Sequence, residues 1–139
     1  MASSARAERR RQARAAAKRQ PAERDGLVFQ RGAGDCMAAV TATYLRLPYS
    51  AMPAIDGQHD PVTFWTDWMD WAATRGLVMS VFAWAPGHLE RWIAVLGRDG
   101  PSMHGVVMAG PELHHDPALP ENRVQRIERD DVMLSLIHI

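Results

Sequence analysis

The chain holds one cysteine, and it stands where a thiol could act as a nucleophile. Cys36 directly follows a Gly-Asp pair, and an apolar segment begins behind it. A nucleophilic thiol needs a base to deprotonate it, a third group to orient that base, and donors for the oxyanion. His104 and Asp116 follow Cys36 in that order. We therefore expect Cys36 as nucleophile, His104 as general base and acid, and Asp116 as the group that orients the imidazole.

Donors for an oxyanion are expected close to the cysteine. Gln30 precedes Cys36 by six residues, and its side-chain amide is one candidate donor. The backbone N–H of Cys36 is the second. One such donor is worth roughly 3–4 kcal/mol of transition-state stabilisation.

A helix is predicted to carry the cysteine at its start. The apolar positions repeat with the spacing of one helical face, at Cys36, Ala39, Val40, Thr43, Tyr44 and Leu47. Asp35 is placed to cap this helix, and Pro48 helps to end it. The dipole and the unpaired N–H groups of the first turn favour an anion, which suits a thiolate at Cys36.

A hairpin is predicted to carry the other two residues. Two short strands, 103–108 and 112–115, flank the tight turn Ala109-Gly110-Pro111. The hairpin places His104 near the start of one arm and Asp116 at the end of the other.

The rest of the folded part supplies packing. Asp60 and Pro61 predict the start of a helix over 62–75 that Gly76 ends, with an aromatic face interpreted as core. Asp67 and Asp70 on this helix are interpreted as a solvated face. Strands are predicted over 77–84 and 93–96, a loop over 97–102, and a last strand or amphipathic piece within 124–136.

Several motifs together resemble the papain-like cysteine peptidase superfamily, in particular small phage and bacterial domains similar to bacteriocin-processing peptidases. The resemblance covers about Phe29 to Pro117. It rests on Gln30 with Cys36 six positions on, Gly34-Asp35-Cys36, Leu45-Arg46-Leu47-Pro48 leading to Met52-Pro53, Gly100-Pro101-Ser102-x-His104-Gly105-Val106-Val107, and His115-Asp116-Pro117.

This resemblance implies an α+β fold in which an N-terminal cysteine-bearing helix packs on a small antiparallel sheet that carries His104 and Asp116. It also implies a cysteine peptidase, or a related acyl-transfer enzyme, that acts on a peptide or protein and requires no cofactor. The chain departs from the family pattern at two places. Gly105 stands where alanine is expected, and Ala118-Leu119-Pro120 replaces the expected His-Pro-Ser after Pro117.

Each of these residues also has an ordinary structural interpretation. A lone cysteine on a helix face is more often a small core residue, and Asp-Pro after a strand is common turn chemistry. The residue order, the Gln30–Cys36 spacing and the hairpin together favour the triad. A metal site at His104, His114, His115 and Asp116 is disfavoured, because adjacent strand residues point to opposite faces.

The charge of the chain is polarised between a tail and a body. Residues 1–24 carry eight Arg or Lys and two acidic residues, whereas residues 25–139 carry eight Arg and fourteen acidic residues. We expect a basic, unpacked tail and linker at 1–26 and the hydrolase domain at 27–133. The tail is either an arm for nucleic acid or a solubilising extension. Residues 134–139 resemble a translated adapter sequence, so we expect a non-native end there.

The cysteine count and the lengths of the apolar runs limit the classes of protein to which the chain could belong. One cysteine excludes an internal disulfide, which makes a reducing, cytoplasmic compartment the expectation. No apolar run approaches the 18–20 residues of a membrane span. The alternative to an enzyme is a non-catalytic papain-like binding module, phage-associated, whose basic tail touches nucleic acid.

Overall fold

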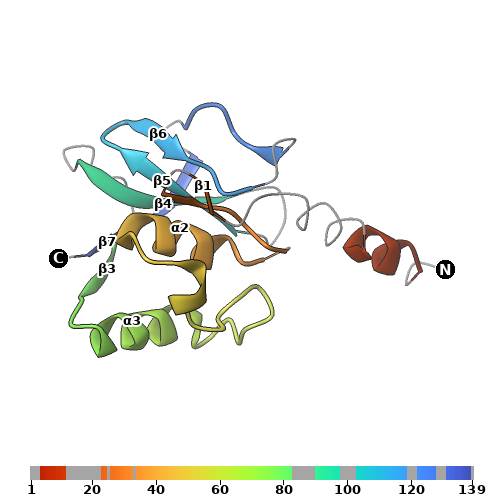
Figure 1. The fold of residues 1–139 in the computed structure, drawn as a ribbon, viewed down its shortest axis with the longest axis horizontal. Coiled ribbons are helices and arrows are strands. Elements are labelled where there is room, and N and C mark those ends of the chain that lie inside the picture. The colour runs from red at the N-terminus through yellow and green to blue at the C-terminus, as the bar shows by residue number, and fades with distance from the viewer. Residues whose placement is uncertain are drawn as a thin grey trace.

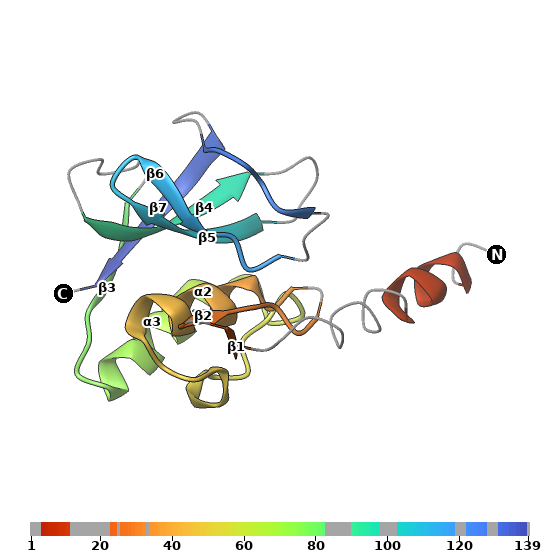
Figure 2. The same ribbon diagram turned by 45° about the horizontal axis from the view of Figure 1, so that its top comes forward.

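Two helices pack against one face of an antiparallel sheet in the computed structural model of the chain (Figure 1). The structure describes residues 4–11, 23–24, 26–32, 34–82, 90–97, 103–118, 122–127 and 131–138. Its helices are α2 (Cys36–Leu45), the short 3₁₀ helix η1 (Tyr49–Ala51) and α3 (Phe64–Thr74). A further exposed helical segment spans residues 4–11 (Figure 2).

The main sheet has five strands in the order β3-β7-β4-β5-β6, and all of its pairs are antiparallel. Its members are β3 (Met79–Phe82), β4 (Arg91–Gly97), β5 (Met103–Ala109), β6 (Glu112–His115) and β7 (Val132–His138). A separate two-stranded hairpin, β1 (Glu23–Arg24) and β2 (Leu27–Val28), precedes the cysteine loop. The described part of the chain is therefore α+β, as predicted.

Alternating side chains of β4 divide the core into two parts. Ile93 and Val95 pack with Cys36 and Val40 of α2, and Trp68 of α3 joins the same cluster. On the other face, the second cluster contains Trp92, Ala94, Leu96, Val106 and Met108. This two-residue period is the pattern of a strand that is buried on both faces. The first cluster holds the cysteine-bearing helix against the centre of the sheet.

The helix predicted to begin at Cys36 is confirmed, whereas the second helix is shorter than predicted. Helix α3 begins at Phe64 with Thr63 at its N-cap position, so the prediction of Asp60 as cap is wrong. Asp60 instead accepts a hydrogen bond from the Val62 N–H, at 2.9 Å, within the turn that leads to the helix. A carboxylate two residues before an amide can close such a local turn as readily as it can cap a helix.

The hairpin that carries His104 is confirmed. Strands β5 and β6 pair across the turn at Gly110, whose φ of 57° is in the left-handed region. Strand β4 begins two residues earlier than predicted. Residues 83–84 of the predicted strand and the 98–102 part of the predicted loop lie outside the described residues.

The end of the chain takes part in the sheet. Strand β7 lies between β3 and β4 and pairs with both, and Ser135 in it is fully buried. Whether residues 134–139 are native stays a prediction. Within the described residues, no helix is long and apolar enough to cross a membrane.

Candidate active site

Cys36 is the first residue of α2, and its side chain is buried where the helix meets the sheet. Gly105 of β5 permits this close approach. A Cβ on Gly105 would lie 3.1 Å from both the Met37 sulfur and Val40 Cγ2. Such distances are tighter than ordinary contacts, so the absence of a side chain at Gly105 lets β5 lie directly against the first turns of α2. Glycine at this position thus has a packing reason.

His104, the second residue of β5, forms a buried pair with Asp116. His104 Nε2 lies 2.7 Å from Asp116 Oδ1, and both side chains are nearly inaccessible. Asp116 also accepts hydrogen bonds from two backbone amides, Ala118 N at 2.9 Å and Val124 N at 2.9 Å. The carboxylate is thus fixed by three donors, and the imidazole is oriented by the carboxylate.

A β-bulge at His114 allows these two residues to meet. The register passes from Met108 opposite Leu113 to Val107 opposite His115, so His114 is an extra residue on β6. If this register is extended by one residue beyond His115, Asp116 lies opposite Val106. Alternate residues share a face, so Asp116 and His104 lie on the same side of the sheet. Without the bulge, Asp116 would fall opposite Gly105, on the other face.

His104 is hydrogen-bonded to both Cys36 and Asp116. Burial lowers the pKa of His104, but the hydrogen bonds to Asp116 and Cys36 outweigh it and raise this pKa to about 9. Since Nε2 is bound to Asp116, Nδ1 is the ring nitrogen that remains for the thiol. Burial also raises the pKa of Asp116, but the hydrogen bonds from His104, Val124 and Ala118 bring it below its usual value. The charged forms of both residues are thus favoured at neutral pH.

Asp35 occupies the N-cap position of α2, but its side chain does not cap the helix, so that prediction is wrong. The carboxylate turns back into the preceding loop. It accepts hydrogen bonds from Arg31 N at 2.8 Å, Gly32 N at 3.1 Å and the Tyr49 hydroxyl at 2.8 Å. Burial and this last hydrogen bond raise the pKa of Tyr49. Asp35 therefore organises the loop before Cys36 and does not cover the N–H groups of the first helical turn.

Gln30 lies in the same loop and is half-buried. Its side-chain Nε2 donates to the Gly32 carbonyl at 3.1 Å, and its backbone N–H donates to the Pro117 carbonyl at 2.9 Å. The second bond joins the cysteine loop directly to the residue that follows Asp116. Of the four predicted residues, the structure brings Cys36, His104 and Asp116 into one hydrogen-bonded set, and Gln30 lies in the loop bonded to that set.

His115 supplies a second connection between the loop and the hairpin. Its Nε2 donates to the Val28 carbonyl at 2.7 Å, and its ring packs edge-on against Phe29 at 5.0 Å. Burial lowers the pKa of His115, so the ring is neutral. His114 is exposed and points elsewhere. Among the residues that the structure describes, no group of three or more His, Cys, Asp or Glu side chains could hold a metal ion.

A cavity of about 500 Å³ opens beside Cys36. Its apolar wall comes from Met37, Phe64, Trp65 and Val95, and its polar wall includes Asp56 and His59. This volume is within the range of small-molecule and peptide side-chain sites. The cavity gives a substrate access to the side of the thiol.

His59 of the cavity wall pairs with Asp67, a contact that the sequence did not indicate. His59 Nε2 lies 2.6 Å from Asp67 Oδ2. Hydrogen bonds from His59 and Thr63 lower the pKa of Asp67. The sequence interpretation of Asp67 as part of a solvated face misses this contact. The two residues are eight positions apart, and the turn between them has neither the helical nor the strand repeat. The sequence therefore contains no periodic pattern that would pair them.

Comparison of the chain with known protein families, with curated proteins and with solved structures finds no match.

Proposed function

We propose that the protein is a papain-like thiol hydrolase, most simply a cysteine peptidase, that uses Cys36, His104 and Asp116 to cleave a peptide or amide bond. The observation that carries this proposal is the hydrogen-bonded set that joins the thiol to the imidazole and the imidazole to a buried carboxylate. Three residues far apart in sequence form this set in the order that nucleophilic catalysis requires.

The first half of the reaction acylates the enzyme. The Cys36 thiolate attacks the carbonyl carbon, and the carbonyl electron pair moves onto oxygen to form the oxyanion. The Cys36 backbone N–H and the Gln30 amide would donate to this oxygen. Gly32 holds one N–H of that amide, which orients the other. The imidazolium of His104 then gives its proton to the leaving amine as the C–N bond breaks, and a thioester remains on Cys36.

The second half releases the acid. His104, now neutral, takes a proton from water, and the resulting hydroxide attacks the thioester carbonyl. Collapse of this intermediate expels the Cys36 thiolate, frees the carboxylic acid and restores the imidazolium. Asp116 keeps its charge throughout and stabilises the imidazolium state. No step needs a metal or an organic cofactor.

Covalent labelling by an electrophilic thiol-peptidase probe, such as a peptidyl vinyl sulfone, tests this function. The intact protein should be labelled at Cys36 at pH 7, while Cys36→Ala should not be labelled and His104→Ala should react much more slowly. A mixed peptide library analysed by mass spectrometry would then show cleavage that Cys36→Ala abolishes. Labelling of the intact protein at the rate of the His104→Ala variant would contradict the proposal.

The alternative is a non-catalytic module of the same fold whose basic tail binds nucleic acid. The exposed helical segment 4–11, which includes four arginines, is the feature that favours it. Under this alternative, deletion of residues 1–20 abolishes salt-dependent association with DNA or RNA. The absence of such association in the intact protein at low salt would remove this alternative.

A further inference from the structure

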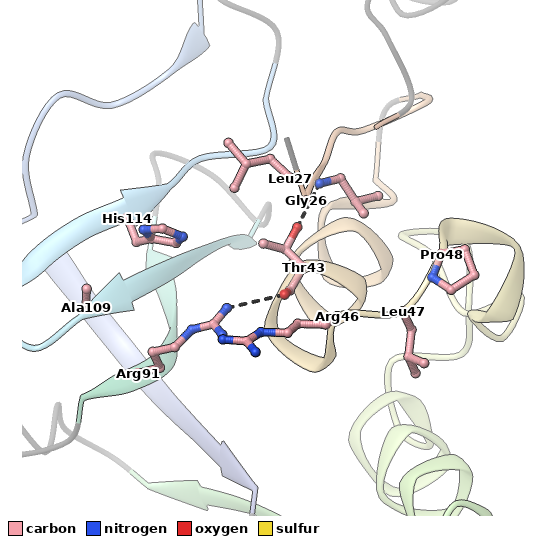
Figure 3. A pocket seen from close by; sticks show the side chains of 10 residues that line it. Gly26, Leu27, Thr43, Arg46, Leu47, Pro48, Arg91, Ala109 and His114 are labelled. Atoms are coloured by element: carbon pink, nitrogen blue, oxygen red, sulfur yellow. Dashed lines mark hydrogen bonds between the residues drawn. The ribbon is translucent and has the colours of Figure 1, made fainter. Parts of the chain in front are cut away.

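A second cavity lies at the opposite end of α2 from Cys36 (Figure 3). Its volume is about 760 Å³, within the range of sites for small organic ligands. Helix α2 has ten residues, so its two ends are about 15 Å apart at ~1.5 Å per residue. The cavity is therefore distinct from the thiol site.

Basic side chains from different elements converge in this cavity. Arg46 follows the last turn of α2, Arg91 begins β4, and His114 is the bulged residue of β6. In Figure 3 the guanidinium groups of Arg46 and Arg91 point into the same part of the cavity. The remaining wall is largely apolar, with Leu27, Leu47 and Pro48.

The protein's own contacts leave this charge incompletely balanced. Arg91 donates to the Thr43 carbonyl at 3.3 Å, and its guanidinium lies 5.4 Å from the centroid of the Tyr44 ring. The carbonyl end of a helix carries about half a negative charge, against two full positive charges here. Across the described ranges, neither arginine is in an ion pair with a carboxylate. An anion between the two guanidinium groups would balance their positive charge.

The backbone of Arg46 has an unusual conformation for a residue other than glycine. Its φ of 58° lies in the left-handed region, where glycine is the usual residue at a helix C-terminus. An arginine in this conformation is disfavoured relative to right-handed backbone. In Figure 3 the exposed side chain of Arg46 extends toward Arg91.

We propose that this cavity binds a small organic anion, whose phosphate or carboxylate group is held by Arg46 and Arg91. The planar fork of a guanidinium donates two parallel hydrogen bonds to such oxygens. The apolar body of the ligand lies against Leu27, Leu47 and Pro48. This inference does not depend on the chemistry at Cys36.

The test is an NMR titration of the ¹⁵N-labelled protein with phenyl phosphate, benzoate, inorganic phosphate and neutral phenol. Phenyl phosphate or benzoate should shift the amides of Leu27, Leu47 and Ala109 saturably, and the tighter of the two identifies the anionic group. Inorganic phosphate should bind more weakly, because it lacks the apolar body, and phenol should not bind.

Arg46→Gln tests the arginine, and Arg75→Gln is the matched control. Arg75 is the exposed C-cap of α3 and lies outside the cavity. Arg46→Gln should weaken binding about tenfold, the size of one lost charge-assisted hydrogen bond, and Arg75→Gln should leave it within about twofold. Unchanged affinity in Arg46→Gln, phenol binding as tight as that of the anions, or no saturable shift with any anion would each overturn the proposal.

Discussion

Asp116 lies on the same side of the sheet as His104 because His114 is bulged out of β6. Their hydrogen bond of 2.7 Å therefore depends on one extra residue in the strand between the turn and the carboxylate. An extra residue in a strand turns the side chains that follow it to the opposite face of the sheet.

Deletion of His114 should separate the pair. The regular register would turn Asp116 to the opposite face, and His104 would lose the hydrogen bond that raises its pKa. NMR titration of the imidazole should then give a His104 pKa well below 9, whereas His114→Ala, which keeps the residue count, should leave the pKa near its value in the intact protein. A folded deletion variant whose His104 still titrates near 9 would show that the bulge does not position Asp116.

Asp116→Asn should lower the pKa of His104 while keeping the shape of the side chain. The substitution removes a full charge, so the effect of burial is offset less, the pKa of His104 falls and less of the imidazole is charged at pH 7. The rate of Cys36 alkylation at pH 7 should fall roughly tenfold to a hundredfold, since a neutral imidazole stabilises a thiolate poorly. Imidazole titration and alkylation kinetics measure the two effects separately, and an unchanged pKa would remove Asp116 from the site.

The stability of the fold should depend on pH through His104. Its folded pKa of about 9 is above its ordinary value of 6.5, so the contribution of the imidazolium is complete below pH 6.5 and is lost as pH rises through 9. The difference in free energy of unfolding between the intact protein and His104→Gln, measured in urea, should be largest at pH 6 and smallest at pH 9.5. A difference that is constant over this range would mean that the folded and unfolded pKa values are equal.

The Asp35–Tyr49 contact should stabilise the cysteine loop. Tyr49→Phe removes one of the three hydrogen bonds to the carboxylate and should lower the free energy of unfolding by about 1–2 kcal/mol. Asp35→Ala removes all three hydrogen bonds and should lower the free energy of unfolding further than Tyr49→Phe does. It should also slow the alkylation of Cys36 more than Tyr49→Phe does. A double-mutant cycle gives the coupling energy of the pair, and a value near zero would show that the hydroxyl does not hold the loop.

Deletion of residues 134–139 should strongly destabilise the protein. The truncation removes most of β7, whose backbone pairs with β3 on one side and β4 on the other. We expect a loss of at least about 3 kcal/mol in the free energy of unfolding, since a buried ladder is left unpaired on both sides. Val78→Ala at an exposed position is the control and should change stability by less than about 0.5 kcal/mol. Unchanged stability after truncation would place these residues outside the fold.

Periodicity and turn chemistry were enough to predict where the main residues of the site lie in the secondary structure. The 3.6-residue spacing after Cys36 predicted α2, and Gly110-Pro111 predicted the hairpin that carries His104. The bulge at His114 has no signature in side-chain type. The residue after it, His115, is bonded to Val28 of the segment before the cysteine loop, a long-range contact that no local pattern encodes.

Local competition between hydrogen bonds explains the other differences between the predicted and the observed roles of residues near the helix starts. Asp35 and Asp60 are both short carboxylates before a helix, and each closes the loop that precedes the helix and leaves it uncapped. Asp35 accepts from amides three and four residues before it, whereas Asp60 accepts from an amide two residues after it. The path of the loop therefore decides which amides a carboxylate near a helix start can reach. The His59–Asp67 pair likewise depends on the fold of the turn before α3.

The rate of alkylation of Cys36 by iodoacetamide between pH 6 and 7 is the most direct measurement of the central claim. If His104 and Cys36 form a thiolate–imidazolium pair, the intact protein should react rapidly over this range, and His104→Ala should be slower by tenfold or more. If instead the intact protein reacts no faster than His104→Ala, with a rate that rises only near pH 8.5 as for an ordinary thiol, then the two side chains do not act together and the site is not a thiol hydrolase.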